Sequence, residues 1–224
     1  MKVDKFQNII KSTPSSSDQK TMKKVYGICL LMKKNKGRPV LVGGFVRDLI
    51  LKKLGQRKEV SFKDIDIEIY DLHKEEVESA LSKDPNELVS TVGKSYGVYK
   101  IGNEIDVSLP REEEKVGSGH KGFKTSFSNK LSIHQASSRR DFTCNAIAID
   151  PFTGEIIDSH NGVSDILEKK LKCVDAKKFA EDPLRVLRAM RFAAVLGFNI
   201  EESTKKVCQK IDLSELSNSR IGEE

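Results

Sequence analysis

Two aspartates, Asp64 and Asp66, lie in a run that alternates charged residues with isoleucines, and this spacing points to metal chemistry. Successive side chains of a β-strand point to opposite faces, so residues 64, 66 and 68 are predicted to share one face and the isoleucines the other. Two carboxylates about 7 Å apart along a strand repel each other unless a cation lies between them. Hard oxygen ligands suit Mg²⁺, with phosphates completing its shell. The alternative is a solvated face of an edge strand.

A third carboxylate, Asp106, lies in a similar alternating run. Strands are predicted at 98–101 and 104–109, joined by a two-residue Gly102-Asn103 turn. Three carboxylates converging from two strands would form a two-metal site for nucleotidyl transfer. One cation would activate an attacking 3′-hydroxyl, and both would stabilise the transition state. Glu68 and Glu104 compete with Asp106 for the third position.

A glycine pair, Gly43-Gly44, separates a predicted strand at 40–42 from a predicted helix at 45–54. Glycines there let backbone N–H groups approach a phosphate, and the helix N-terminus adds positive potential. Arg47 lies in the first turn, where its guanidinium could reach the same phosphate. The alternative is a tight turn with an arginine that faces solvent.

Two arginine-rich segments follow. An arginine pair ending at Arg140 precedes a predicted strand at 146–150, and a fixed guanidinium there suits a triphosphate oxygen. A predicted helix at 177–196 carries arginines at every third position, namely Arg185, Arg188 and Arg191. Asp182-Pro183 fits the start of that helix, so a capping role for Asp182 is a real alternative. A solvated face is the alternative for the arginines, but no acid after the first turn compensates them, which favours a phosphate or base contact.

Composition limits the class of protein. The chain has 224 residues, of which 38% are hydrophobic and 32% charged, as in a globular protein with one sizeable domain and a smaller one. The net charge of +6 favours an anionic partner such as RNA or a nucleotide. Four dispersed cysteines without a CxxC motif indicate reduced thiols and argue against zinc. With no membrane-length apolar run and no signal peptide, we expect a cytoplasmic location.

The order of predicted elements indicates an α+β domain that leads into a helical one. Residues 1–20 are polar and serine-rich, and they are expected to form a flexible arm. A mixed-sheet catalytic head is expected over 21–158 and a helical domain over 159–224. Within the head, residues 110–130 are rich in glycine and charge and are predicted to form a mobile loop.

Taken in order, these segments resemble the class II tRNA nucleotidyltransferase and bacterial poly(A) polymerase family. The resemblance runs from about residue 40 to the end and rests on five motifs: Gly43–Asp48 with Asp64-x-Asp66, the loop Arg111–Phe123, Arg139–Ala146, Asp158–Gly162 and Glu181–Arg191. It implies a polymerase-β-like head that carries the metals and a helical neck that selects the nucleobase.

By this resemblance the chain adds C and A to the 3′ end of tRNA from CTP and ATP with Mg²⁺. Cytosine and adenine both present an amine donor beside a ring-nitrogen acceptor, and Asp182 with Arg185 offers the complementary groups, whereas uracil and guanine present the opposite order. Asp64 and Asp66 would bind metal and act in catalysis with Asp106. The implied nucleotide-binding residues are Gly43, Gly44, Arg47, Arg140, Asp182, Arg185, Arg188 and Arg191.

Two departures leave alternatives open. Ser219 stands before Arg220 where the family carries a glutamate, and the body and tail helices that grip tRNA are missing, so a second chain could supply them. An A-adding or poly(A)-forming transferase is one alternative, and retention of the loop disfavours a CC-only enzyme. A catalytically silent RNA- or nucleotide-binding module is another, which the presence of both aspartates disfavours.

Overall fold

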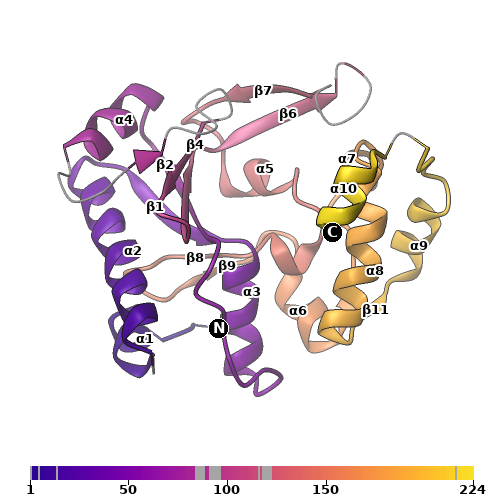
Figure 1. Ribbon diagram of the computed structural model, residues 1–224, viewed down its shortest axis with the longest axis horizontal. Coiled ribbons are helices and arrows are strands. Elements are labelled where there is room, and N and C mark those ends of the chain that lie inside the picture. Colours follow the sequence, from indigo (N-terminus) through magenta and orange to yellow (C-terminus); the bar gives the residue numbers. More distant parts are fainter. Residues whose placement is uncertain are drawn as a thin grey trace. The chain divides into compact units, whose positions relative to one another are not determined.

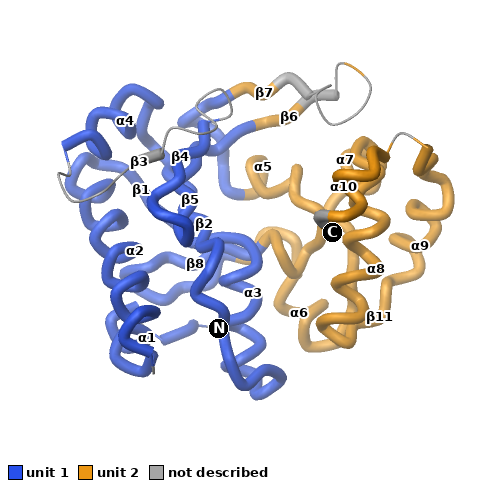
Figure 2. The backbone as a smooth tube through the Cα atoms, in the orientation of Figure 1, with its two compact units in different colours: residues 1–111, 127–133, 147–157 blue, residues 112–126, 134–146, 158–224 orange. Residues whose placement is uncertain are grey.

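The computed structural model describes residues 2–4, 6–13, 15–83, 89–90, 97–115, 117, 123–214 and 216–224 (Figure 1). They divide into two compact units (Figure 2). Unit 1 comprises 1–111, 127–133 and 147–157, and unit 2 comprises 112–126, 134–146 and 158–224. The division therefore differs from the expected single boundary at 158, because two segments from the middle of the chain belong to unit 2.

In the part of the chain that the structure describes, unit 1 is built on a mixed seven-stranded sheet. Its strands are β1 (Arg38–Val42), β2 (Ile65–Tyr70), β3 (Val89–Ser90), β4 (Val98–Ile101), β5 (Ile105–Ser108), β8 (Ala148–Ile149) and β9 (Ile156–Ile157). They lie in the order β3-β4-β5-β2-β1-β8-β9, with β2 and β5 parallel and β1 and β2 antiparallel. This confirms the predicted α+β class with a mixed sheet. Because β2 is an inner strand, the edge-strand alternative for the aspartate run is wrong.

The helices of unit 1 are α1 (Phe6–Ser12), α2 (Ser16–Lys34), α3 (Gly44–Lys53) and α4 (Lys74–Ser82). Both α2 and α3 contact β1 and β2. On β2 the isoleucine face is fully buried, at Ile65, Ile67 and Ile69. The predicted isoleucine face is therefore confirmed, and it anchors the strand in the core of unit 1.

The expected flexible arm at residues 1–20 has regular structure instead. It contains α1 and the first turn of α2, and Phe6 is only 2% exposed. The Val3 N–H donates to the Gly154 carbonyl at 2.9 Å, which ties the N-terminal segment to the β8–β9 turn. Serine-rich composition suggested disorder, but the apolar residues Phe6 and Ile9 lie three apart and bury one face of a short helix.

The β4–β5 hairpin has a longer turn than predicted. Ile101 pairs with Ile105, so three residues connect the strands rather than the expected Gly102-Asn103 pair. Gly102 has a φ of 63°, a conformation that glycine adopts without strain. The extra residue, Glu104, moves the register of the hairpin by one position. This change decides which side chain faces Asp106.

The segment predicted as a mobile loop at 110–130 contains two paired strands, β6 (Arg111–Lys115) and β7 (Phe123–Phe127). The loop prediction is therefore wrong for its flanks. Residues 116 and 118–122 lie outside the described residues.

Unit 2 contains most of the remaining elements. They are α5 (Ile133–Ser137), which begins at the unit boundary, the 3₁₀ turn η2 (Thr143–Asn145), α6 (Gly162–Leu167), β10 (Lys170–Leu171), α7 (Ala176–Ala180), α8 (Leu184–Leu196), β11 (Asn199–Ile200), α9 (Glu202–Cys208) and α10 (Asn218–Glu223). Phe142 packs edge-on against Phe179 and Phe192, with ring centroids 5.5 and 5.8 Å apart. The helix predicted at 177–196 is broken into α7 and α8, because Pro183 disfavours helix at the residue before it.

No helix in the described ranges combines the length and the hydropathy that a membrane crossing requires.

Candidate functional site

Two of the predicted carboxylates lie in register on neighbouring strands. Asp66 on β2 and Asp106 on β5 are Cα partners across the parallel pair, and Val42 of β1 lies opposite Asp66 on its other side. Partners directly across a sheet project from the same face, so both carboxylates are presented together. Asp66 and Asp106 thus bring acidic groups from two strands to one place.

Asp64 differs from its predicted position. It precedes β2, is exposed, and has a left-handed φ of 52°, so strand alternation does not apply to it. The sheet begins one residue later, where the Ile65 N–H donates to the Glu104 carbonyl at 2.8 Å. Within the described ranges, no three His, Cys, Asp or Glu side chains are grouped closely enough to hold a metal ion. A cation at Asp66 and Asp106 would therefore need further oxygens, for example from a phosphate.

The two competitors for the third carboxylate have other partners. Glu68 is buried, at 1% exposed, and accepts a hydrogen bond from the Tyr70 hydroxyl at 2.5 Å. The Glu104 carboxylate accepts from the Asn103 N–H at 3.2 Å inside the hairpin turn. Asp106 differs from both in being the direct cross-strand partner of Asp66, which favours it for the third position.

A residue that sequence reasoning missed, Lys100, contacts Asp106. Its Nζ lies 2.9 Å from both carboxylate oxygens of Asp106. Lys100 and Asp106 are Cα partners in the β4–β5 ladder. The only sequence signal was the hairpin itself, and the predicted two-residue turn would have placed Tyr99 opposite Asp106.

The glycine turn has the backbone that its sequence predicted. Gly43 adopts φ 81° and ψ −150°, which a side chain would not allow, and α3 begins at Gly44. A Cβ on Gly44 would lie 3.5 Å from Nη2 of Arg47, so this guanidinium lies beside the turn. Backbone N–H groups at the start of α3 and a neighbouring cation suit a phosphate.

Arg47 is held in the interior, so the alternative of a solvent-facing arginine is wrong. Its side chain is 9% exposed, and its Nε donates to Asp48 Oδ1 at 2.8 Å. Arg57 Nη1 lies 2.9 Å from the same oxygen. Asp48 and Arg57 were not predicted as site residues. Asp48 is the last residue of the Gly43–Asp48 motif and could have been found from it, whereas Arg57 belongs to no motif that would have indicated it.

In unit 2, Asp141 organises the segment that follows Arg140. Its carboxylate accepts from the Phe142 N–H at 2.7 Å, from Asn145 Nδ2 at 3.0 Å and from Arg188 Nη2 at 2.7 Å. Burial alone would raise the pKa of Asp141, but Arg188 and these donors together hold that pKa below its ordinary value. Arg140 itself donates weakly to the Asn145 carbonyl, at 3.5 Å.

Asp182 has two kinds of partner. Its Oδ1 accepts from the N–H of Leu184, the first residue of α8, at 3.2 Å, although the N-cap position of α8 is Pro183 and not Asp182 as predicted. Arg220 of α10 donates Nη1 to Oδ1 at 3.0 Å and Nη2 to Oδ2 at 3.2 Å. Arg220 therefore holds Asp182 with a two-point contact, although Ser219 replaces the expected glutamate.

The three arginines of α8 also have partners, although the side chains of Arg188 and Arg191 remain 31% and 37% exposed. Arg185 donates to two backbone carbonyls, to Lys178 at 3.0 Å and to Arg139 at 2.6 Å. Arg188 pairs with Asp141, and Arg188 and Arg191 both contact the Glu224 carboxylate. Burial would lower the pKa of Arg188, but Asp141 and Glu224 raise it overall. The compensating acids come from distant segments of the chain.

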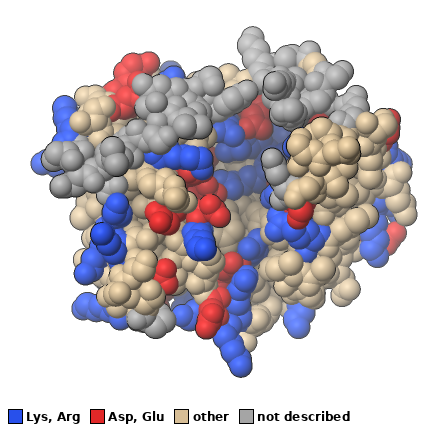
Figure 3. Space-filling model, viewed as in Figure 1, with Lys and Arg blue, Asp and Glu red and all other residues tan. Residues whose placement is uncertain are grey.

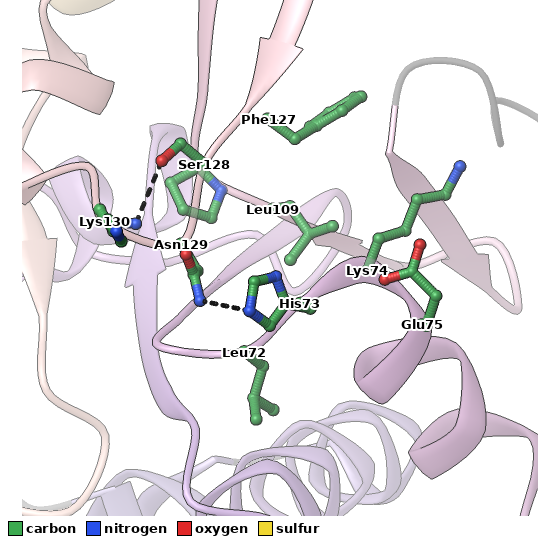
Figure 4. Close-up of a pocket in the computed structure, with 10 residues that line it drawn as sticks. Leu72, His73, Lys74, Glu75, Leu109, Phe127, Ser128, Asn129 and Lys130 are labelled. Carbon is green, nitrogen blue, oxygen red and sulfur yellow. Dashed lines mark hydrogen bonds between the residues drawn. The ribbon is translucent and has the colours of Figure 1, made fainter.

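A separate hollow of about 520 Å³ lies where β2 and β5 end, away from Asp66 and Asp106 at their beginnings (Figure 4). His73 and Asn129, which line it, are hydrogen-bonded at 3.2 Å. None of the predicted site residues is among the described residues that line it. Figure 3 shows Lys and Arg side chains at many places on the visible face.

Comparisons with known proteins find similar chains and structures. Residues 40–172 match the family described as Poly A polymerase head domain. A "Multifunctional CCA protein" of Pasteurella multocida is 38% identical over 80% of this chain and 40% of its own length. A "CCA-adding enzyme" of Buchnera aphidicola is 37% identical over 82% of this chain and 43% of its own length.

A solved structure, the Bacillus stearothermophilus CCA-adding enzyme in complex with CTP, matches with a TM-score of 0.65 and 30% identity. The match covers 84% of this chain and 42% of that one. The chain thus spans less than half the length of these relatives. The family match includes Asp64, Asp66, Asp106 and the glycine turn. The chain belongs to the Poly A polymerase head domain family.

Proposed function

We propose that this chain is a nucleotidyltransferase that adds C and A to the 3′ end of tRNA from CTP and ATP. The observation that carries the proposal is the in-register pair Asp66 and Asp106, on the sheet that also supports the glycine turn at β1–α3. The names of the relatives support CCA addition in particular. A cytoplasmic location, where these substrates are found, belongs to the same proposal.

The donor set fits Mg²⁺. Asp66 and Asp106 provide hard carboxylate oxygens, Asp64 lies two residues before Asp66, and incoming phosphates would complete the shell. When bound, the ion would stabilise charge on the phosphoryl group and make the 3′-hydroxyl a better nucleophile. Asp66 and Asp106 would fix where the ion binds.

The remaining residues have separate roles. The backbone N–H groups at Gly43 and Gly44, with Arg47, would hold the triphosphate, because the positive start of α3 and a guanidinium suit phosphate oxygens. Arg140, Arg188 and Arg191 are assigned to further phosphate contacts. Arg188 and Arg191 would keep their present carboxylate partners while using their remaining N–H groups.

Asp182 and Arg185 are assigned to reading the base. A carboxylate has about four acceptor positions, and Asp182 uses three of them on Leu184 and Arg220. Arg185 uses two N–H groups on backbone carbonyls and has others to donate. An amine of cytosine or adenine could therefore bind Asp182, and the neighbouring ring nitrogen could accept from Arg185, without breaking the present contacts.

The description of the matched family favours a second candidate, an A-adding or poly(A)-forming transferase. The same in-register carboxylates would serve it, so only the products separate the two. A silent binding module would share the fold but release no pyrophosphate. A second chain that supplies further RNA-binding surface is compatible with each of these candidates.

The test is nucleotide incorporation with Mg²⁺ into a tRNA transcript that lacks its terminal CCA and into a short acceptor minihelix. CTP alone, ATP alone and both together are compared on a sequencing gel. We expect CC with CTP alone and CCA with both. Long A-tails would favour the second candidate. Absence of both incorporation and pyrophosphate release on either RNA would contradict the proposal.

A further inference from the structure

Lys100 lies in one transverse row with the candidate metal carboxylates. It is the Cα partner of Asp106 across β4–β5, and Asp106 is the partner of Asp66 across β5–β2. Residues directly opposite each other project from the same face with Cβ atoms about 5 Å apart. A lysine and two aspartates from three neighbouring strands therefore share one small area of the sheet.

The contact between Lys100 and Asp106 uses both atoms that a cation would use. Nζ lies 2.9 Å from Oδ1 and 2.9 Å from Oδ2. The two side chains are 48% and 29% exposed. An ion pair this open is worth about 0–1 kcal/mol, so a bound divalent cation can displace it.

The hairpin does not depend on this ion pair. The β4–β5 ladder runs over four registered pairs, and Tyr99, Ile101 and Val107 are buried on it. These contacts fix the register whether or not Lys100 carries a charge. Loss of the exposed ion pair should therefore change cation binding at Asp106 more than it changes the stability of the hairpin.

We propose that Lys100 is a positioning residue that competes with the divalent cation for Asp106 and then contacts the phosphates of the incoming nucleotide. This inference rests on the proposed function. Without substrate, the ammonium neutralises Asp106. When a cation binds the carboxylate, the flexible four-carbon stem lets the ammonium move to the phosphate oxygens, which are the nearest new negative charges.

This role has two opposite consequences for the same substitution. Removing the charge of Lys100 should tighten binding of the free cation, because a competitor is lost. It should also weaken binding of the nucleotide, because a phosphate contact is lost. A purely structural ion pair would not shift the two affinities in opposite directions.

The first measurement is a Mn²⁺ titration without nucleotide, followed by electron paramagnetic resonance of the free ion. The proteins are wild type, Lys100→Met, Lys100→Gln, Lys100→Arg and the control Lys34→Met, which removes an exposed lysine at the end of α2. We expect Lys100→Met and Lys100→Gln to bind Mn²⁺ about fivefold more tightly. Lys100→Arg and Lys34→Met should resemble wild type. Circular dichroism checks the fold of each variant.

The second measurement is the KM for CTP at saturating Mg²⁺, which should rise about tenfold in Lys100→Met if one phosphate contact is lost. Asp66→Asn identifies the site, because it should abolish the Mn²⁺ signal. Equal Mn²⁺ affinity in wild type and both neutral variants, with Asp66→Asn still abolishing binding, would overturn the role of Lys100 and leave the proposed function intact. Mn²⁺ binding that is insensitive to Asp66→Asn would overturn the proposed metal site and this inference together.

Discussion

The row formed by Asp66, Asp106 and Lys100 in unit 1 and the arginines of α8 in unit 2 differ in how their charges are paired. In the row, Asp106 is 29% exposed and pairs with one lysine, Lys100, whose side chain is 48% exposed. On α8, Arg188 reaches a carboxylate, Asp141, that is 9% exposed and also receives a backbone N–H and a side-chain amide. The exposed ion pair in the row can exchange its partners. Arg188 and Arg191 of α8 are already held by buried carboxylates before any ligand binds. We therefore assign the chemical step to the row in unit 1 and the positioning of the substrate to α8 in unit 2.

Energetics sharpen this contrast. An exposed ion pair contributes about 0–1 kcal/mol, while removing one partner of a buried pair costs about 3–5 kcal/mol. Substitutions in the row should therefore affect activity far more than stability. Substitutions at Asp141 should do the reverse.

The largest effect is expected for Asp66→Asn. The change keeps the shape of the side chain but removes a carboxylate ligand, and metal ions supply several kcal/mol of transition-state stabilisation. We expect single-turnover incorporation of CTP to fall about 1000-fold, with the free energy of unfolding changed by less than about 1 kcal/mol. Asp212→Asn, at an exposed position in unit 2, is the matched control. Activity within tenfold of wild type would contradict the role of Asp66.

Asp141→Asn should have the next largest effect, and on stability. Arg188 would keep only Glu224 as a carboxylate partner, and we expect the free energy of unfolding to fall by about 3 kcal/mol. Urea denaturation followed by circular dichroism measures this loss, with Asp212→Asn expected to stay within about 0.5 kcal/mol of wild type. A loss below 1 kcal/mol would show that α8 is held by its apolar contacts instead. Mn²⁺ binding by Asp141→Asn should remain, because the row lies in the other unit.

Arg220→Ala should have a moderate effect on substrate binding. Arg220 holds both oxygens of Asp182, and a two-point contact of this kind fixes orientation as well as charge. We expect the KM for CTP and for ATP to rise about tenfold, which corresponds to about 1.4 kcal/mol, and incorporation of UTP to increase. Arg220→Lys keeps the charge but not the fork, so it should be intermediate. Lys206→Ala on α9 is the control, and a KM unchanged in Arg220→Ala would contradict the role of this contact.

Local patterns in the sequence predicted much of unit 1. The alternating isoleucines predicted the buried face of β2, and the glycine pair predicted the turn before α3, because both signals depend on neighbouring residues alone. The register of the β4–β5 hairpin could not be predicted from neighbouring residues alone. One extra turn residue, Glu104, places Lys100 opposite Asp106, and composition does not distinguish a two-residue turn from a three-residue one.

The partners of α8 could not be predicted for a different reason. Arg188 and Arg191 find their acids at Asp141 and Glu224, which lie far away in sequence. Helical periodicity indicates which side of a helix a residue occupies but not which distant segment covers it. The same limit applies to Arg57, which contacts Asp48 without any motif of its own. Asp64 was misplaced because the start of a strand is poorly marked in sequence.

The smallest expected effect is a pH dependence confined to unit 2. Burial lowers the pKa of His160, and the charges of His134 and Lys178 lower it further against the opposing Asp158. The unfolded chain, with a histidine pKa of about 6.5, then binds the proton more readily than the folded one. The stability that neutral His160 contributes is complete above that value and is lost as the pH falls toward the lowered pKa of the folded state.

Urea denaturation at several pH values between 7.5 and 5 should show that the free energy of unfolding falls more steeply for wild type than for His160→Gln, which cannot titrate. The metal row should keep its Mn²⁺ affinity in His160→Gln, since the substitution lies in the other unit. Equal slopes in the two proteins would contradict the effect of His160.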